Sequence, residues 1–284
     1  MLRAAIERKV LNLTGHAVGG IDYDQPRGDP GLFGPNAVCW RVHGDFSSML
    51  VGGISALLLQ MLHPLALAGV WDHSNFRADM LGRLRRTARF ISATTFAPKA
   101  QALGEIERVK AIHLAVTGKD ASGRPYAASD PGLLTWVHVA EMYSFLNAYL
   151  AYGPVPLPEV DKDRYFAETA LVAEALGATD VPKSHRDAKA YLLSKRGSLR
   201  VDDRTIDVFH ALLNAPAPDW LAALMRSSFM AAGVANLPEF AKALYGSELK
   251  RARTKVPALV RLTAPIIRWS LVNSAAARAR RRVA

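Results

Sequence analysis

Histidines are the first residues in this chain that could do chemistry, because four of the eight lie in or beside segments expected to form the core: His63, His73, His113 and His138. A neutral imidazole binds iron through one ring nitrogen, and a single axial histidine on a helix is enough to hold a haem. Each of these residues can equally be an ordinary buried or surface histidine with its hydrogen bonds satisfied. Both interpretations therefore stay open for each of the four.

The sequence around the histidines excludes several other kinds of site. There is no HExxH motif, and no two histidines stand four apart on an expected helix, which argues against a zincin-type zinc centre. The residues three before His113 and His138 are Lys110 and Thr135, so the ExxH pairs of a di-iron carboxylate bundle are missing. The patterns of dinucleotide sites, P-loops and esterase nucleophiles are missing as well.

A basic segment, GRLRRTARFISATTF, could bind an anion. It places Arg83, Arg86 and Thr87 on one helical face at spacings of three and four. Guanidinium groups and a hydroxyl can hold a carboxylate such as a haem propionate, or a phosphate, by charge-assisted hydrogen bonds. The alternative is an ordinary solvated basic face, because Leu84 and Phe90 also give the segment the pattern of an amphipathic helix.

The most apolar stretch, residues 49–70, must form part of the core around these groups. It is long enough to span a bilayer but contains Gln60, His63 and Pro64, and polar side chains of this kind are costly in a membrane. We therefore predict a helix buried in a protein core, with Asp45 as a candidate cap in front of it.

Two further helices carry candidate ligands. Residues 103–116 repeat apolar side chains every three or four positions, which places His113 beside an apolar stripe. Asp130 is a good N-cap with Pro131 at the first helical position, so a helix carrying His138 is predicted to run to Gly153. The stripe on the first helix consists of Leu103, Ile106, Val109, Ile112 and Val116.

Helical stretches separated by Pro and Gly continue to the end of the sequence, and no alternating β-branched run reaches strand length. A short hairpin at residues 124–127 is the one β element expected. The predicted fold is all-α, a single helical domain. The remaining expected helices are one that begins at Asp79 and those over residues 162–176, 185–195, 205–213, 218–234, 238–245 and 256–275.

Composition sets the class of protein and its surroundings. The chain has 284 residues, of which 50% are hydrophobic and 21% charged, which excludes collagen-like, disordered and coiled-coil classes. Its single cysteine, Cys39, allows no internal disulfide, and the charged N-terminus does not have the pattern of a signal peptide, so a reducing cytoplasmic location is expected. The net charge of +11 is concentrated in residues 77–89 and in an arginine-rich tail that we expect to be frayed or in contact with an anionic surface.

Four segments in a fixed order resemble a known family: QMLHPLALAGVWDHSNF, GRLRRTARFI, ERVKAIHLAV and GRPYAASDPGLLTWVHVAEMYSFLNAY. Together they are similar to the catalytic domain of the MpaB-like oxygenases and rubber oxygenases (latex-clearing proteins). The resemblance implies an all-α domain with a globin-like core around a b-type haem. It also divides the chain into an N-terminal helical extension (residues 1–39), the catalytic domain (40–275) and a basic tail (276–284).

The resemblance also implies site residues. In the rubber-cleaving relatives one proximal histidine holds the haem iron, which fits His113 best, with His138 as the rival or a neighbouring partner. The family's distal lysine corresponds to Arg86, and the glutamate proposed as its base falls near Leu67, so rubber is not the expected substrate. The assigned catalytic residues are Arg83, Arg86, Thr87 and His73, and the cofactor-binding residues are His113, His138, Arg83, Thr87 and His63, with His113 as the metal ligand.

Three functions are weighed. The first is a haem b-dependent oxygenase acting with O2 on an apolar, lipid-like or isoprenoid-like molecule. The second is a haem or lipid carrier that uses the same apolar interior without oxygen chemistry. Nucleic-acid binding rests on charge alone and comes last, because aromatic residues do not interleave with the basic runs. The basic tail and an apolar substrate are both compatible with peripheral contact with an anionic membrane.

Overall fold

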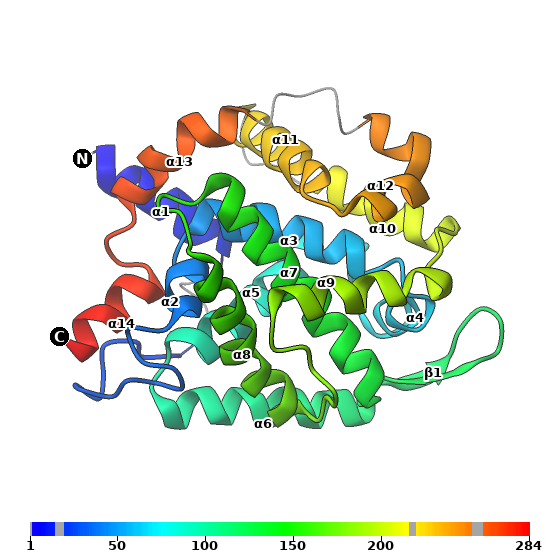
Figure 1. Ribbon diagram of the computed structural model, residues 1–284. Coiled ribbons are helices and arrows are strands. Elements are labelled where there is room, and N and C mark those ends of the chain that lie inside the picture. The colour runs from blue at the N-terminus through cyan, green and yellow to red at the C-terminus, as the bar shows by residue number, and fades with distance from the viewer. Residues whose placement is uncertain (1, 15–19, 216–219, 252–257) are drawn as a thin grey trace.

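The computed structural model describes residues 2–14, 20–215, 220–251 and 258–284, and this part of the chain is almost entirely helical (Figure 1). The predicted all-α single domain is confirmed. Its α-helices are α1 Leu2–Thr14, α2 Val38–His43, α3 Phe46–Gln60, α4 Pro64–His73, α5 Met80–Phe96, α6 Lys99–Ala115, α7 Pro131–Tyr152, α8 Glu159–Leu176, α9 His185–Ser194, α10 Asp203–Leu213, α11 Trp220–Ala235, α12 Glu239–Tyr245, α13 Ala258–Ser270 and α14 Ala275–Val283. Two 3-10 helices, η1 Arg196–Ser198 and η2 Gly246–Arg251, and two strands, β1 Thr117–Lys119 and β2 Pro125–Ala127, complete the described elements.

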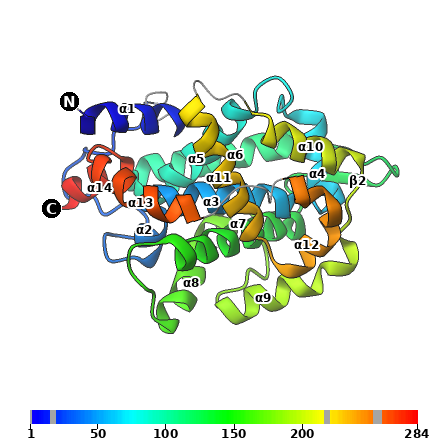
Figure 2. The ribbon, with the colours of Figure 1, turned by 90° about the horizontal axis from the view of Figure 1, so that it is seen from above.

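Helices α3 and α7 run side by side through the middle of the molecule, and the other helices surround them (Figures 1 and 2). A glycine makes their close approach possible. A Cβ atom on Gly52 would lie 2.7 Å from Cδ1 and 2.8 Å from Cα of Phe145 on α7. Gly233 plays the same part where α11 crosses α3, because a Cβ there would lie 2.4 Å from a side-chain atom of Ile54.

The apolar stretch over residues 49–70 is two helices rather than the single helix we predicted. Helix α3 ends at Gln60, and α4 starts with Pro64 at its first position after a bend of 105°. Proline fits the first turn of a helix but removes a backbone donor and clashes in the interior, so the chain breaks here. Within the described segments no single helix is long and apolar enough to cross a membrane, although the bent pair α3 and α4 passes the test of length and composition.

The start of α3 is fixed as predicted. Asp45 caps the helix by accepting from the backbone N–H of Ser48 at 2.9 Å, and its carboxylate also binds the guanidinium of Arg268 on α13. A side-chain cap of this kind satisfies a backbone donor that would otherwise have no partner.

Helix α6 buries a different face from the predicted stripe. Leu103 and Ile112 are 44% and 47% exposed, whereas Glu105 is buried. The Glu105 carboxylate can be buried because it binds Arg89 of α5 at 2.5 Å and Arg108 of its own helix at 2.6 Å. The stripe facing the protein therefore consists of Ala102, Glu105, Ile106, Val109, His113 and Val116.

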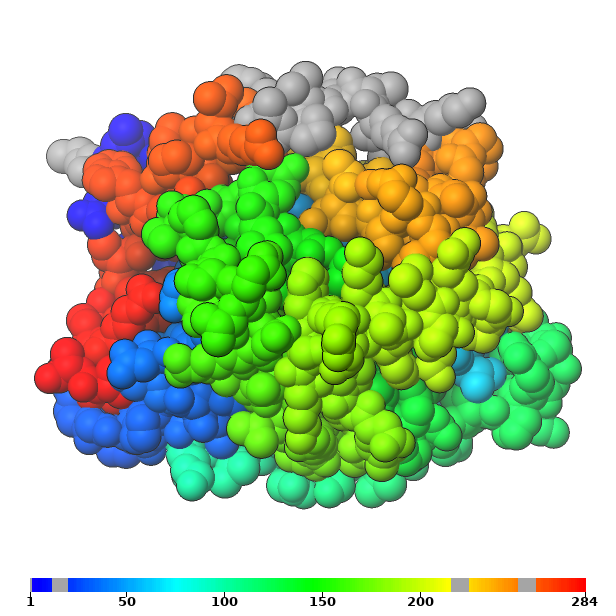
Figure 3. All heavy atoms as spheres, viewed as in Figure 1, coloured from blue at the N-terminus to red at the C-terminus, as the bar shows by residue number. Residues whose placement is uncertain are grey.

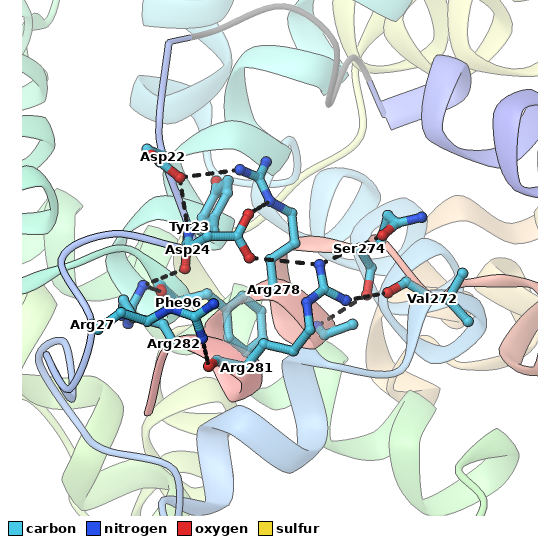
Figure 4. A network of polar contacts seen from close by, with 12 residues as sticks. Asp22, Tyr23, Asp24, Arg27, Phe96, Val272, Ser274, Arg278, Arg281 and Arg282 are labelled. Carbon is cyan, nitrogen blue, oxygen red and sulfur yellow. Dashed lines mark hydrogen bonds and ion pairs between the residues drawn. The ribbon is translucent and has the colours of Figure 1, made fainter. Parts of the chain in front are cut away.

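The arginine-rich tail is not frayed, contrary to our expectation, but forms α14. Arg282 is buried, and its guanidinium donates to the backbone carbonyls of Asp29, Tyr23 and Phe96 at 2.8 to 2.9 Å. Arg278 donates to Asp24 at 2.6 Å (Figure 4). These bonds attach α14 to residues 23–29 and to the end of α5. The blue and red ends of the colour range lie beside each other at this end of the molecule (Figure 3).

The predicted hairpin is present and lies at the opposite end (Figures 1 and 2). Strands β1 and β2 are antiparallel, with Thr117 opposite Ala127. Helix α7 begins directly after it, capped by Asp130, which accepts from the N–H of Leu133 at 2.8 Å, and with Pro131 at its first position as predicted.

Candidate functional site

The order of elements brings three of the candidate ligands toward the hairpin end of the molecule. Helices α5 and α6 are packed antiparallel and joined by two residues, so the start of α5 and the end of α6 lie at the same end. Because α6 leads into the hairpin and α7 leaves it, Arg83 near the start of α5, His113 near the end of α6 and His138 in the first half of α7 belong to the same half of the protein (Figure 1).

Helices α5 and α7 have different main packing partners. Helix α5 packs against α6, α2, α1 and α14, whereas α7 packs mainly against α3, α8 and α9. On α7, His138 and Glu141 stand three residues apart on one face and stay only partly buried, while Val139, Ala140 and Met142 between and after them are buried. Side chains that keep accessible surface inside a helical bundle indicate an internal space beside this face.

Burial nevertheless dominates the electrostatics of both groups. It lowers the pKa of His138 to about 4 and raises the pKa of Glu141 to about 7. Desolvation disfavours whichever form carries the charge, so both side chains tend toward their neutral forms. In the described segments neither side chain has a hydrogen-bond or ion-pair partner.

A small polar cluster joins α2, α5 and α8. Nδ1 of His43 lies 2.8 Å from the Thr95 hydroxyl, and its Nε2 lies 2.8 Å from the Tyr165 hydroxyl. The Thr95 hydroxyl donates to the carbonyl of Ile91 at 2.7 Å, so Nδ1 of His43 donates to Thr95. Nε2 of the neutral ring then accepts from the Tyr165 hydroxyl, for which the sulfur of Met142 at 3.3 Å is the weaker acceptor. Burial lowers the pKa of His43 to about 3, which keeps this imidazole neutral.

His113 presents the better nitrogen for a ligand. Its Nδ1 is buried without a partner among the described residues, while its Nε2 has no partner and keeps accessible surface. In His138 the situation is reversed, because Nε2 is the enclosed nitrogen. Burial lowers the pKa of His113, so its imidazole is neutral at pH 7 and has a free lone pair. The sequence left the choice between the two open, and the accessible Nε2 favours His113.

The predicted anion-binding face is divided by the structure. Arg83 is half-buried, burial lowers its pKa to about 10, and its guanidinium has no hydrogen-bond or ion-pair partner in the described part of the chain. Arg86 is exposed and lies 3.9 Å from the carboxylate of Asp79. The exposed Thr87 hydroxyl donates to the Arg83 carbonyl at 3.4 Å. An enclosed guanidinium without a counter-ion is costly, so Arg83 is the member of this set that is suited to hold an anion.

The remaining two histidines lie near the hairpin. The ring of His63 is 5.7 Å from that of Trp136 on α7, burial lowers its pKa to about 4, and its enclosed Nδ1 has no partner among the residues described. His73 is exposed, and one ring nitrogen lies 3.2 Å from the carbonyl of Thr117 on β1. His63 thus faces the base of α7, whereas His73 connects α4 to the hairpin.

Comparison with known families decides what kind of protein this is. Residues 40–269 match the model of the family described as "ER-bound oxygenase mpaB/B'/Rubber oxygenase, catalytic domain". The chain belongs to this family. No curated protein and no solved structure gives a significant match, so the globin-like form of the core stays a prediction.

Membership of the MpaB and rubber oxygenase family makes the protein an oxygenase by class, with O2 and a small molecule as its reactants. In the described segments of this oxygenase no three His, Cys, Asp or Glu side chains are grouped so that they could hold a metal ion together. A haem needs only one imidazole, because the porphyrin supplies the other ligands. The half-buried side chains of His113 and Arg83, which have no partners in the described segments, are the residues here that could hold such a group and its acidic substituents.

Our reading of the sequence missed Glu141. It is the only charged residue in α7, a helix of 22 residues that is otherwise apolar or uncharged. A lone acid inside such a helix was the available signal, because carboxylates are rarely enclosed without a partner.

Proposed function

We propose that this protein is a haem b-dependent oxygenase that acts with O2 on an apolar molecule. The observation that supports it best is the pairing of an accessible, neutral imidazole on α6 with an unpaired, enclosed guanidinium on α5. His113 would hold the haem iron through Nε2, and Arg83 would bind a propionate. When bound, the haem supplies the iron chemistry that activates O2.

The protein's own residues would do three things. His113 offers a lone pair at neutral pH because burial lowers its pKa. Arg83 compensates the negative charge of the cofactor edge, while Arg86 and Thr87 stand exposed on the same turn toward solvent. Neutral groups on α7, His138 among them, line the interior without bringing a fixed charge, so water is poorly held and an apolar molecule can enter.

The test is an absorption spectrum of the freshly purified protein, and of the protein after reconstitution with haem, before and after dithionite and CO. We expect a Soret band that shifts on reduction. The His113→Ala variant should lose the band or shift it, whereas the His138→Ala variant should keep it. A Soret band that never forms, or one that neither substitution changes, would refute the proposal.

Arginine variants give a matched test of the anion site. We expect the Arg83→Gln variant to bind haem roughly ten- to hundredfold more weakly, since a charge-assisted hydrogen bond contributes about 1.5–3 kcal/mol. The Arg86→Gln variant, altered at an exposed side chain on the same turn, should bind within about twofold of wild type. A stable oxygenated haem that consumes no unsaturated lipid would instead identify the protein as a carrier.

A further inference from the structure

The Glu141 carboxyl group is the least explained feature of the interior. It points from the middle of α7, one turn after His138, and in the described segments it has neither a hydrogen-bond donor nor a cation beside it. Its oxygens are not among the enclosed polar atoms without partners, so they keep accessible surface. A carboxyl group that faces an interior space with nothing to satisfy it is available to a ligand.

Three uncharged polar groups lie in the region of Glu141. His138 on α7 and His43 on α2 are neutral imidazoles, and the Tyr165 hydroxyl on α8 is held protonated because burial raises its pKa. Tyr165 is close enough for the Glu141 charge to raise its pKa further, which places these two groups in the same region. Arg83 has only Arg86 as a charged neighbour, so it does not neutralise Glu141.

Burial raises the pKa of the Glu141 carboxyl group to about 7, so about half of the molecules carry it as the neutral acid at pH 7, whereas an exposed carboxyl group would be ionised. In the neutral form it has one O–H donor in addition to its carbonyl oxygen. A ligand with an uncharged oxygen satisfies this donor. A carboxylate ligand would place a negative charge in an enclosed site beside a group that is itself ionised in about half of the molecules, and a hydrocarbon would leave the donor unpaired.

We propose that Glu141 is the polar anchor of the substrate site, and that the substrate is an apolar molecule with one uncharged oxygen, such as a long-chain alcohol, aldehyde or ketone. This inference rests on the proposed function, because only an oxygenase would make the bound molecule a substrate. The binding itself requires no haem chemistry. The carboxyl group donates its hydrogen bond to the ligand oxygen while the chain lies in the apolar interior.

The test uses three ligands of one chain length, dodecane, dodecan-1-ol and dodecanoate, and measures dissociation constants at pH 7 by displacement of a fluorescent apolar probe from the full-length protein. We expect the Glu141→Leu variant to bind dodecanol roughly three- to tenfold more weakly than wild type, the effect of one hydrogen bond. Its affinity for dodecane should be unchanged or higher, and its affinity for dodecanoate should rise.

Two controls complete the design. The Glu141→Gln variant retains the shape and a donor, so it should keep most of the dodecanol affinity even if the leucine variant folds poorly. Glu107→Gln, on an exposed residue of α6, should change none of the three constants. Equal effects of Glu141→Leu on all three ligands, or no binding of any of them to wild type, would overturn the proposal. The Soret band is recorded separately, so a failure of the Glu141 proposal can be distinguished from a failure of the proposed haem binding.

Discussion

The close contact between α3 and α7 can be tested with two adjacent glycines. Gly52 faces α7, where an added Cβ would lie 2.7 and 2.8 Å from side-chain and backbone atoms of Phe145 and 3.0 Å from the carbonyl oxygen of Ser144. A Cβ on Gly53 would meet only Cε1 of Phe145, at 3.9 Å, an ordinary van der Waals distance. Gly52→Ala should therefore force the two central helices apart, and Gly53→Ala should not.

The magnitude follows from two effects. Replacing glycine by alanine inside a helix stabilises the helix by about 0.5–1 kcal/mol, and both variants share this gain. Overpacking a close-packed contact costs about 1–3 kcal/mol, and only Gly52→Ala incurs this cost, because its neighbours include backbone that cannot rotate away. The difference in the free energy of unfolding between the variants should thus be about 1–3 kcal/mol, with Gly53→Ala the more stable.

Equilibrium unfolding in urea, followed by circular dichroism, measures this difference, provided that the two variants have the same m-value. Because the glycines are neighbours in one helix, differences in helix propensity cancel. If Gly52→Ala proves as stable as Gly53→Ala or more so, the contact between α3 and α7 is looser than described, and the packing that positions His138 and Glu141 would have to be reconsidered.

Two further predictions concern the tail and pH. Arg282→Met should lower the free energy of unfolding by about 3–5 kcal/mol, because three enclosed carbonyls lose a charged donor, while the exposed Arg280→Met should change it by less than about 0.5 kcal/mol in the same urea titration. The free energy of unfolding should fall as pH falls from 6.5 toward 4. In this range three histidines become protonated in the unfolded chain but stay neutral in the folded protein, because burial lowers their pKa. For each histidine, the loss in the free energy of unfolding is about 3 kcal/mol or more once the pH has fallen from the unfolded to the folded pKa. Of the groups with a resolved pKa shift in the described segments, only Glu141 acts in the opposite direction, between pH 7 and 4.5. A urea midpoint that rises on acidification would contradict the burial of these histidines as neutral groups. The three histidines are His43, His63 and His138.

Local chemistry explains what the sequence could predict. Asp45, Asp79 and Asp130 each cap the helix that was expected to follow, because a carboxylate next to a helix start satisfies a backbone N–H whatever the rest of the fold does. The hairpin was predicted for a similar reason, from turn residues close together in the chain. These features depend on neighbours within a few positions, so a single sequence carries them.

Features that depend on distant partners were missed. The buried face of α6 includes Glu105, whose burial depends on Arg89 from another helix, and apolar periodicity alone assigned that face to Leu103 and Ile112. The break at Pro64 was readable but was overridden by the apolar character of the stretch.

The candidate site shows the same limit. Spacing grouped Arg83 with Arg86 and Thr87, yet only packing decides which of the three turns inward. Glu141 was passed over because a sequence does not show whether a carboxyl group on an apolar helix meets a cation from elsewhere. Its lack of a partner became visible only once the surrounding helices were in place.

The ion pairs of Glu105 have a consequence for how this pocket could change among relatives. By binding Arg89 and Arg108, the carboxylate cross-links α5 to α6, the two helices that carry Arg83 and His113. The proposed iron ligand and propionate anchor are thereby built on one braced pair of helices, while Glu141 stands on another. Substitutions on α7 that reshape the proposed substrate site would therefore leave the ion pairs between α5 and α6 in place, and with them the residues proposed to hold the cofactor.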